Sequence, residues 1–217
     1  ANAVPMWWIV DDRGRAVAGE QWQARTIPRG KNIALGKITA DLAKLKAPQA
    51  YRLVVSLKGT TIENAWNFWL YPAQADKSPA KDILVTNSWD EAEARLSAGG
   101  KVLFLPRPSD LDWTSPPLDT VPIFWSRLMN PGWGRMLGLW CNTRHPALAA
   151  FPTAENCDWQ WTEVLRGARA VNLDRLPRQL RPIVQAIDDW NRNYKLGLVF
   201  ECKVANGRLM VCSADLE

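Results

Sequence analysis

Few side chains in this sequence could perform nucleophilic or acid–base chemistry. His145 is the only histidine among 217 residues, and Cys141 precedes it by four positions. A cysteine beside a histidine can form a nucleophilic pair, because the imidazole takes up the thiol proton. However, Asn142 and Thr143 follow Cys141 where a nucleophile elbow would require a glycine-containing turn. A hydrolase that uses Cys141 and His145 is therefore an alternative and not the main hypothesis.

Metal and cofactor chemistry is not indicated. Cys141, His145, Cys157 and Asp158 have no recognised metal-ligand spacing, so no metal site is expected. An expected strand over 82–86 is followed by no glycine-rich phosphate loop, which argues against a bound dinucleotide. We expect no cofactor.

Carboxylate pairs are a third source of chemistry, since glycoside hydrolysis usually needs two of them on either side of the bond. The sequence offers Asp188 with Asp189, Glu155 with Asp158, and Glu163. Asp188 and Asp189 are expected on the solvated face of a helix. Spacing alone assigns none of these carboxylates a catalytic role.

Tryptophan is unusually abundant, with 13 residues, and several of them lie in segments predicted to be loops. An indole ring can stack on a sugar while a neighbouring polar side chain binds the hydroxyls. The residues predicted to bind a sugar in this way are Trp113, Trp133, Trp159 and Trp161, with Arg144 and Asp158 as polar partners. The alternative is that Trp159 and Trp161 anchor a helix and that the other two fill an interface.

Charge and hydropathy exclude two classes of partner. The net charge is +5, but the lysines and arginines are scattered, so no nucleic-acid partner is expected. No apolar run approaches the ~20 residues of a membrane span.

The chain begins Ala1-Asn2-Ala3, without Met or a signal-like segment, which indicates a processed product or an excised piece of a longer protein.

Residues 1–72 are predicted to form a small β-sandwich. Strands are expected over 6–10, 51–57 and 65–71, separated by glycine- and proline-containing turns. In the last of these, apolar residues recur with a period of two, which is typical of a strand. Residues 73–81 have the small, polar composition of a linker, and we place the domain boundary there.

Residues 82–217 are predicted to form an α/β domain. Strands over 82–86 and 101–105 flank a helix that begins with a capping box of Ser88 and Glu91 and ends at Gly99-Gly100. This strand-helix-strand order predicts parallel pairing. A doubly wound sheet is the expected architecture.

The remaining elements of this segment are two helices, a strand and a hairpin. The strand is expected over 136–140 and the helices over 159–166 and from Pro182, where Ile183, Ile187 and Trp190 mark one helical face. A closing hairpin is expected to turn at Asn206-Gly207, which places Cys202 opposite Val211. Cys202 and Cys212 then point to opposite faces of the sheet, so a disulfide between them is not expected.

Several stretches resemble a known family. Residues 64–72 resemble the closing strand of the immunoglobulin-like domains in bacterial enzymes of glycoside hydrolase family 2, the β-galactosidase and β-glucuronidase group. The second segment resembles the C-terminal domain of some of those enzymes, which is similar to the flavodoxin-like, class I glutamine amidotransferase-like fold. The matching stretches are residues 145–148, 151–153, 158–161, 172–174, 180–190 and 195–200.

The resemblance implies a non-catalytic role. In that family both catalytic glutamates belong to a barrel domain, and a complete barrel takes about 250 residues, so no catalytic residue carries over to this chain. The implied function is a C-terminal accessory region of a polysaccharide-degrading β-glycosidase, periplasmic or secreted, that supports the barrel or subunit contacts. The implied partners are the catalytic domain of the same polypeptide and a polysaccharide. The alternatives are a carbohydrate-binding module and a cysteine-dependent, amidotransferase-like hydrolase.

Overall fold

The chain folds into two compact units. The computed structural model describes residues 2–74, 81–120, 136–189 and 192–214. Residues 1–75 with 150–152 form the first unit, and residues 76–149 with 153–217 form the second. The linker predicted over 73–81 lies mostly outside the described residues.

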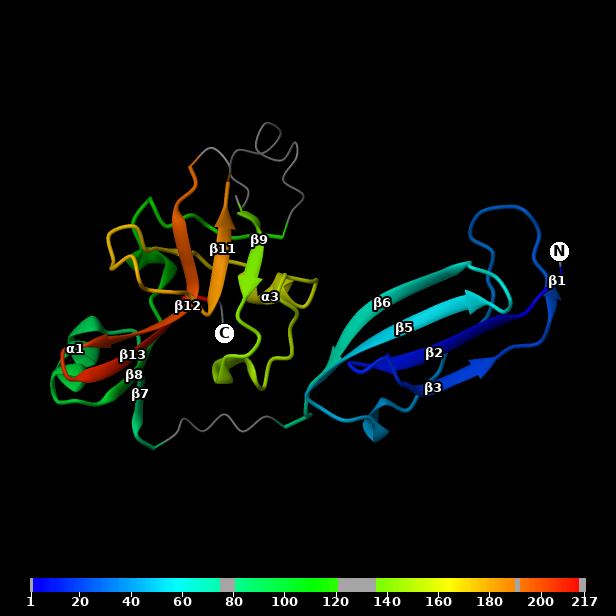
Figure 1. Ribbon diagram of the computed structural model, residues 1–217, viewed down its shortest axis with the longest axis horizontal. Helices are drawn as coiled ribbons and strands as arrows, with labels where there is room; N and C mark the ends of the chain where they lie inside the picture. Colours follow the sequence, from blue (N-terminus) through cyan, green and yellow to red (C-terminus); the bar gives the residue numbers. More distant parts are fainter. Residues whose placement is uncertain (1, 75–80, 121–135, 190–191, 215–217) are drawn as a thin grey trace. The chain divides into compact units, whose positions relative to one another are not determined.

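A four-stranded antiparallel sheet, in the order β3-β2-β5-β6, forms the first unit (Figure 1). Its strands are β2 (Pro5–Asp11), β3 (Ala16–Gln21), β5 (Gln49–Leu57) and β6 (Glu63–Leu70), and β1 (Asn2–Ala3) pairs with β4 (Arg25–Thr26) beside them. The three strands predicted in this segment are confirmed as β2, β5 and β6. The β-rich character of the segment is therefore confirmed.

One face of this sheet carries the core of the first unit. Trp7, Ile9 and Tyr51 are buried there, and the Tyr51 ring stacks on Phe68 with 5.6 Å between ring centroids. Apolar side chains from residues 22–45 pack against them. That segment holds only β4 and the short 3-10 helix η1 (Leu42–Lys44). Irregular chain thus covers this face, where the predicted sandwich would have a second multi-stranded sheet.

A mixed seven-stranded sheet forms the second unit, in the order β7-β8-β13-β12-β11-β9, with β10 paired to β12. The strands are β7 (Ile83–Thr86), β8 (Lys101–Phe104), β9 (Met136–Cys141), β10 (Val171–Asn172), β11 (Val184–Asp188), β12 (Lys195–Val204) and β13 (Gly207–Cys212). β7, β8 and β13 run parallel, and every other pair is antiparallel.

The predicted strand-helix-strand unit is confirmed as β7, α1 (Trp89–Ser97) and β8. The helix ends as expected, since Gly99 adopts a left-handed φ of +82°. The predicted capping box is wrong. Ser88 is the N-cap but makes no side-chain capping bond, and the Glu91 carboxylate instead accepts a hydrogen bond from the Thr86 hydroxyl at 2.6 Å.

The described residues do not support a doubly wound, flavodoxin-like sheet. Such a sheet needs parallel strands with crossover helices on both faces. The α-helices described in this unit are α1 and the five-residue α3 (Trp161–Leu165), and most strand pairs are antiparallel. The strand over 136–140 and the short helix over 159–166 are confirmed as β9 and α3.

The helix predicted to begin near Pro182 is wrong, because this segment is strand β11. Ile183 and Ile187 have helical spacing, but the buried side chains of the strand are Val184, Ala186 and Asp188, which alternate with a period of two. β11 lies between β9 and β12 and pairs with both. Backbone pairing on both edges fixes the segment as a strand.

The closing hairpin is confirmed, but its predicted register is wrong. Val204 pairs with Gly207, so the turn is Ala205-Asn206, and Cys202 lies opposite Leu209. A Cβ atom at Gly207 would lie 2.5 Å from the Gly100 carbonyl oxygen, so this glycine is required for close packing and not for the turn. Cys202 and Cys212 still occupy opposite faces, and all four cysteines are free thiols.

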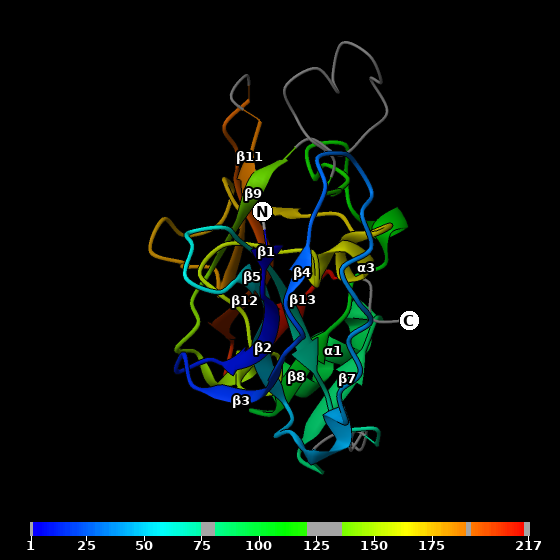
Figure 2. The ribbon, with the colours of Figure 1, turned by 90° about the vertical axis from the view of Figure 1, so that its right-hand side faces the viewer.

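One part of the core of the second unit lies between α1 and the sheet. Ala92 and Leu96 of α1 contact Val102 of β8 together with Leu209 and Val211 of β13. Figure 2 shows α1 beside β7 and β8 from a second direction. Burial of Leu96 is complete, with 0% of its surface exposed. The helix is therefore held by its apolar face.

This packing predicts that Leu96→Ala destabilises the second unit by about 2–5 kcal/mol, because a cavity replaces buried methyl groups. Urea unfolding followed by tryptophan fluorescence would measure the change. Leu176→Ala is the control, since Leu176 is 40% exposed, and should change stability by less than about 0.5 kcal/mol. Equal effects of the two substitutions would contradict the assigned core.

Candidate functional site

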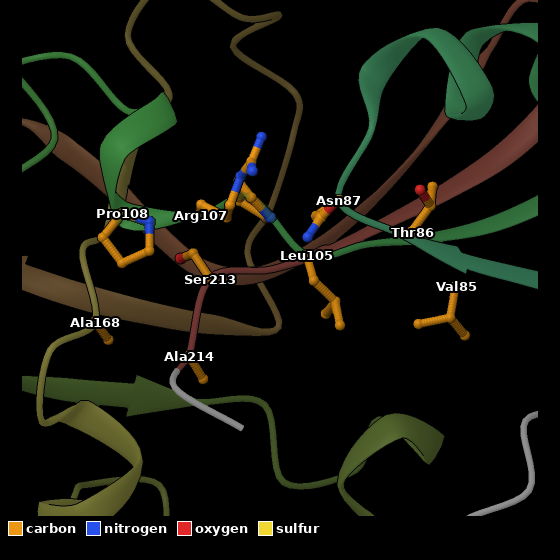
Figure 3. Close-up of a pocket in the computed structure, with 10 residues that line it drawn as sticks. Val85, Thr86, Asn87, Leu105, Arg107, Pro108, Ala168, Ser213 and Ala214 are labelled. Carbon is orange, nitrogen blue, oxygen red and sulfur yellow. The ribbon is translucent and has the colours of Figure 1, made fainter. Parts of the chain in front are cut away.

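A pocket opens where the three parallel strands of the second unit end. The carboxyl ends of β7, β8 and β13 meet at one edge, as Figure 3 shows, and this is where open sheets with parallel strands commonly bind ligands. The pocket has a volume of about 740 Å³. Its lining residues are Val85, Thr86, Asn87, Leu105, Pro106, Arg107, Pro108, Ala168, Ser213 and Ala214.

The polar groups of this strand-end pocket serve the local fold. The Thr86 hydroxyl accepts a hydrogen bond from the Ser88 N–H at 3.0 Å. The Arg107 guanidinium donates to the Asp110 carboxylate at 3.1 Å and lowers the pKa of Asp110. None of the lining residues is a histidine, cysteine or carboxylate. The strand-end pocket can hold a small ligand but presents no acid–base pair to it.

A second pocket brings two of the predicted sugar-binding residues together. We call it the Trp159 pocket, and its volume is about 330 Å³. Asp158 and Trp159 both line it, and the Trp159 side chain is 60% exposed. The lining residues are Asp119, Thr120, Met136, Leu137, Gly138, Cys157, Asp158, Trp159 and Thr162.

The start of α3 positions this pair. The backbone N–H of Trp159 donates to the Asp158 carboxylate at 2.7 Å. The backbone N–H of Trp161 donates to the Asp158 carbonyl at 3.0 Å. Trp161 is only 3% exposed, and its indole N–H donates to the Thr153 hydroxyl at 2.9 Å. Trp161 therefore presents no open ring face and anchors the turn that carries Trp159.

The other predicted sugar-binding residues do not line the Trp159 pocket. Trp113 is 80% exposed, in a turn that Arg169 holds through a hydrogen bond to the Asp112 carbonyl at 3.0 Å. Arg144 is exposed in the turn after β9. Trp133 lies outside the described residues.

Sequence reasoning missed three polar residues of this pocket. Asp119 and Thr120 lie about 40 positions before Asp158, and no motif joins them to it. The hydroxyls of Thr120 and Thr162 lie 3.4 Å apart, which connects the two segments. Only the folded chain shows that they share a pocket.

Cys141 and His145 do not form the nucleophilic pair considered for them. Cys141 ends β9 with 1% of its surface exposed, and burial raises the pKa of its thiol to about 11. The His145 Nε2 atom lies 3.3 Å from a carboxylate oxygen of Glu201, and its Nδ1 atom accepts a hydrogen bond from the Ala147 N–H. The thiol is therefore protonated at neutral pH, and the imidazole is engaged elsewhere.

The prediction that Asp188 and Asp189 lie on a solvated helix face is wrong. Both are buried at the end of β11. The Asp188 carboxylate accepts hydrogen bonds from the Arg192 guanidinium at 2.6 Å and from the Tyr194 N–H at 2.9 Å. Asp188 thus links Arg192 and Tyr194 to the end of β11, and these hydrogen bonds give the buried carboxylate its partners.

The described residues contain no group of three or more His, Cys, Asp or Glu side chains that could hold a metal ion. None of the helices described is both long and apolar enough to cross a bilayer.

Comparison with known proteins gives two family matches. A family model described as a domain of unknown function (DUF8487) matches residues 84–217. A second model, also described as a domain of unknown function (DUF8488), matches residues 1–72. No curated protein matches the chain.

The raised pKa of Cys141 predicts slow alkylation by iodoacetamide at pH 7.5. The rate should rise about tenfold per pH unit until the pH approaches 11, because only the thiolate reacts. Mass spectrometry of the Cys141 peptide would follow the reaction. Chain unfolded in urea, in which all four thiols become accessible, is the control. Rapid labelling of the folded protein at pH 7 would restore Cys141 as a candidate nucleophile.

Proposed function

We propose that this chain, which belongs to the family described as a domain of unknown function (DUF8487), is the non-catalytic C-terminal accessory region of a polysaccharide-degrading β-glycosidase of glycoside hydrolase family 2 type. Its partner is the catalytic domain of the same polypeptide. The accessory region supports that domain or the contacts between subunits. The resemblance of residues 64–72 and 145–200 to such enzymes motivates the proposal.

The exposed tryptophans are the observation that carries the proposal. Among the described residues, five tryptophans keep 42–80% of their surface exposed, and they occur in both units. Tryptophan is costly to leave in water and is enriched at interfaces. Such a surface favours a chain that works against another protein surface or against a glycan. The five are Trp66, Trp89, Trp113, Trp140 and Trp159.

The chemistry of the described residues also favours an accessory role. Cys141 is buried and protonated, so the cysteine-dependent hydrolase loses its nucleophile. The strand-end pocket offers shape and hydrogen-bonding groups without an acid–base pair. The roles that remain for the exposed tryptophans and the strand-end pocket are binding of a ligand and contact with the catalytic domain.

The finer fold and the location belong to the same proposal. The antiparallel sheet of the first unit is compatible with an immunoglobulin-like domain, and the β7-α1-β8 unit is the part that the second unit would share with a flavodoxin-like, amidotransferase-like domain. A polysaccharide substrate implies a periplasmic or secreted enzyme, because such polymers lie outside the bacterial cytoplasm.

The test compares the isolated chain with the complete product of its gene. The gene should encode an in-frame barrel with two catalytic glutamates before Ala1, and the complete product should hydrolyse nitrophenyl β-glycosides. The 217-residue chain alone should release no nitrophenol, because the proposal places both catalytic glutamates in the barrel.

Glutamate-to-glutamine changes in the barrel are the control, and they should abolish the hydrolysis by the complete product. Two outcomes would refute the accessory role. One is hydrolysis by the isolated chain, and the other is a gene that encodes no catalytic domain.

A further inference from the structure

A groove crosses the second unit on the face of its sheet opposite α1. Val102, Cys202 and Leu209 contact the core beneath α1, and side chains alternate along a strand, so the residues next to them project from the other face. On that face β8, β13 and β12, which lie side by side (Figure 1), hold a groove of about 730 Å³. We call it the sheet-face groove. Its two sides are formed by Lys101, Lys203 and Arg208 and by Leu103, Glu201 and Met210.

Three cations form one side of the sheet-face groove. Lys203 of β12 is paired with Arg208 of β13, and Arg208 is paired with Lys101 of β8. All three side chains are exposed. Neighbouring strands lie about 4.8 Å apart, so this row of positive charges spans roughly 10 Å.

Two of these cations face each other without an acidic partner. Lys203 and Arg208 lie directly opposite across an antiparallel pair, where like charges repel. Within the described part of the chain, neither makes an ion pair or a side-chain hydrogen bond, whereas Lys101 forms an ion pair with Asp82. The repulsion opposes folding, and a bound anionic group would relieve it.

The other side of the sheet-face groove is mainly apolar. Met210 of β13 is paired with Leu103 of β8, and both are half-buried. Glu201 of β12 completes the row, and its carboxylate lies 3.3 Å from the Nε2 atom of His145. Among the described residues, none that lines the groove is aromatic, so the groove offers no ring on which a sugar could stack.

The charge of the lining favours an anionic ligand. The lining contains the three cations and a single carboxylate, that of Glu201. Residues 75–80, which precede β7, contain one aspartate and one lysine and leave this balance unchanged. A concave surface with an excess of one charge attracts ligands of the opposite charge.

An extended peptide segment matches the two sides of the groove. Successive side chains of such a segment point in opposite directions, and every second residue lies about 6.6 Å further along. If acidic and apolar residues alternate, the carboxylates face the cations while the apolar side chains contact Met210 and Leu103. Two carboxylates at this spacing fit within the roughly 10 Å row of cations. The Arg208 guanidinium can hold one of them through two parallel hydrogen bonds.

We propose that the sheet-face groove binds an extended acidic segment of a protein partner. Its carboxylates bond to Lys203 and Arg208, and its apolar side chains pack against Met210 and Leu103. The inference goes beyond the accessory role proposed above, since it requires neither a glycan nor a catalytic domain. It uses residues of the second unit alone.

The experiment measures the binding of a fluorescein-labelled peptide of alternating aspartate and leucine to the 217-residue chain by fluorescence anisotropy. Binding should saturate at low salt and weaken at least about tenfold at high salt, because exposed charges are screened. A peptide of the same composition, with its aspartates and leucines in two separate blocks, should bind several-fold more weakly.

Substitutions separate the groove from the general charge of the chain. Arg208→Gln and Lys203→Gln should each weaken binding about two- to fivefold, as the loss of an exposed ion pair does. Arg175→Gln is the matched control, because Arg175 is an exposed arginine of the same unit outside the groove lining, and should bind like the unaltered chain. Neither groove variant should lower the thermal unfolding temperature, since each removes a repulsive contact.

Three results would overturn the proposal. They are no saturable binding of the alternating peptide by the folded chain, an equal loss of binding in Arg175→Gln, or tighter binding of an oligogalacturonate than of the peptide. The last result would assign the groove to an acidic polysaccharide instead of a protein segment.

Discussion

Strand β12 is the element on which the second unit depends. It is the longest of the described strands, with ten residues, and it pairs with β11 on one edge and with β13 and β10 on the other. The parallel strands β7, β8 and β13 would otherwise form a sheet separate from β11 and β9. Leu196 and Leu198 of β12 are fully buried. Backbone pairing and apolar burial therefore act on the same strand.

Both pockets follow from this arrangement. β13 joins β8 in parallel, and this brings Ser213 beside the ends of β7 and β8 at the strand-end pocket. On the other side, β11 holds β9, whose first residues Met136 and Leu137 line the Trp159 pocket. A change that weakened β12 would disturb both pockets, although neither is lined by a residue of that strand.

Local sequence patterns predicted the elements with one unambiguous period and failed where two patterns competed. β6 carries Trp66, Phe68 and Leu70 with a period of two, β2 and β5 are short apolar runs bounded by turn residues, and the strand-helix-strand unit has clear breaks at both ends of its helix. In β11 the helical spacing of Ile183 and Ile187 competed with the alternation of the residues between them. Pairing with β12 and with β9, which lies about 40 positions earlier, decided the outcome, and a local window contains no record of the pairing with β9. Gly207 was predicted to form part of the hairpin turn. In the structure it is a strand residue that packs closely against Leu96 of α1.

The candidate site shows the same limit in a single motif. Trp159 and Trp161 are two positions apart, and the sequence predicted the same role for both. One is anchored in the core and the other lies on the surface, because the direction of α3 and the position of Thr153 decide which indole turns inward. The sequence did not predict Asp119 and Thr120 as pocket residues, since only tertiary folding brings them to the pocket.

At the end of β9, burial of the Cys141 side chain lowers the reactivity of its thiol. Cys141 is the last residue of β9, close to where a nucleophile often lies in α/β enzymes, yet its side chain is buried in the core opposite Val184. Removing a thiol from water disfavours the thiolate, which is the reactive form, so the position that suggests catalysis is also the one that prevents it. The side chains that line the Trp159 pocket are instead mainly an indole, carboxylates and hydroxyls. Groups of these kinds can contact a ligand through stacking and hydrogen bonds, and they are the reason why binding is proposed for this surface.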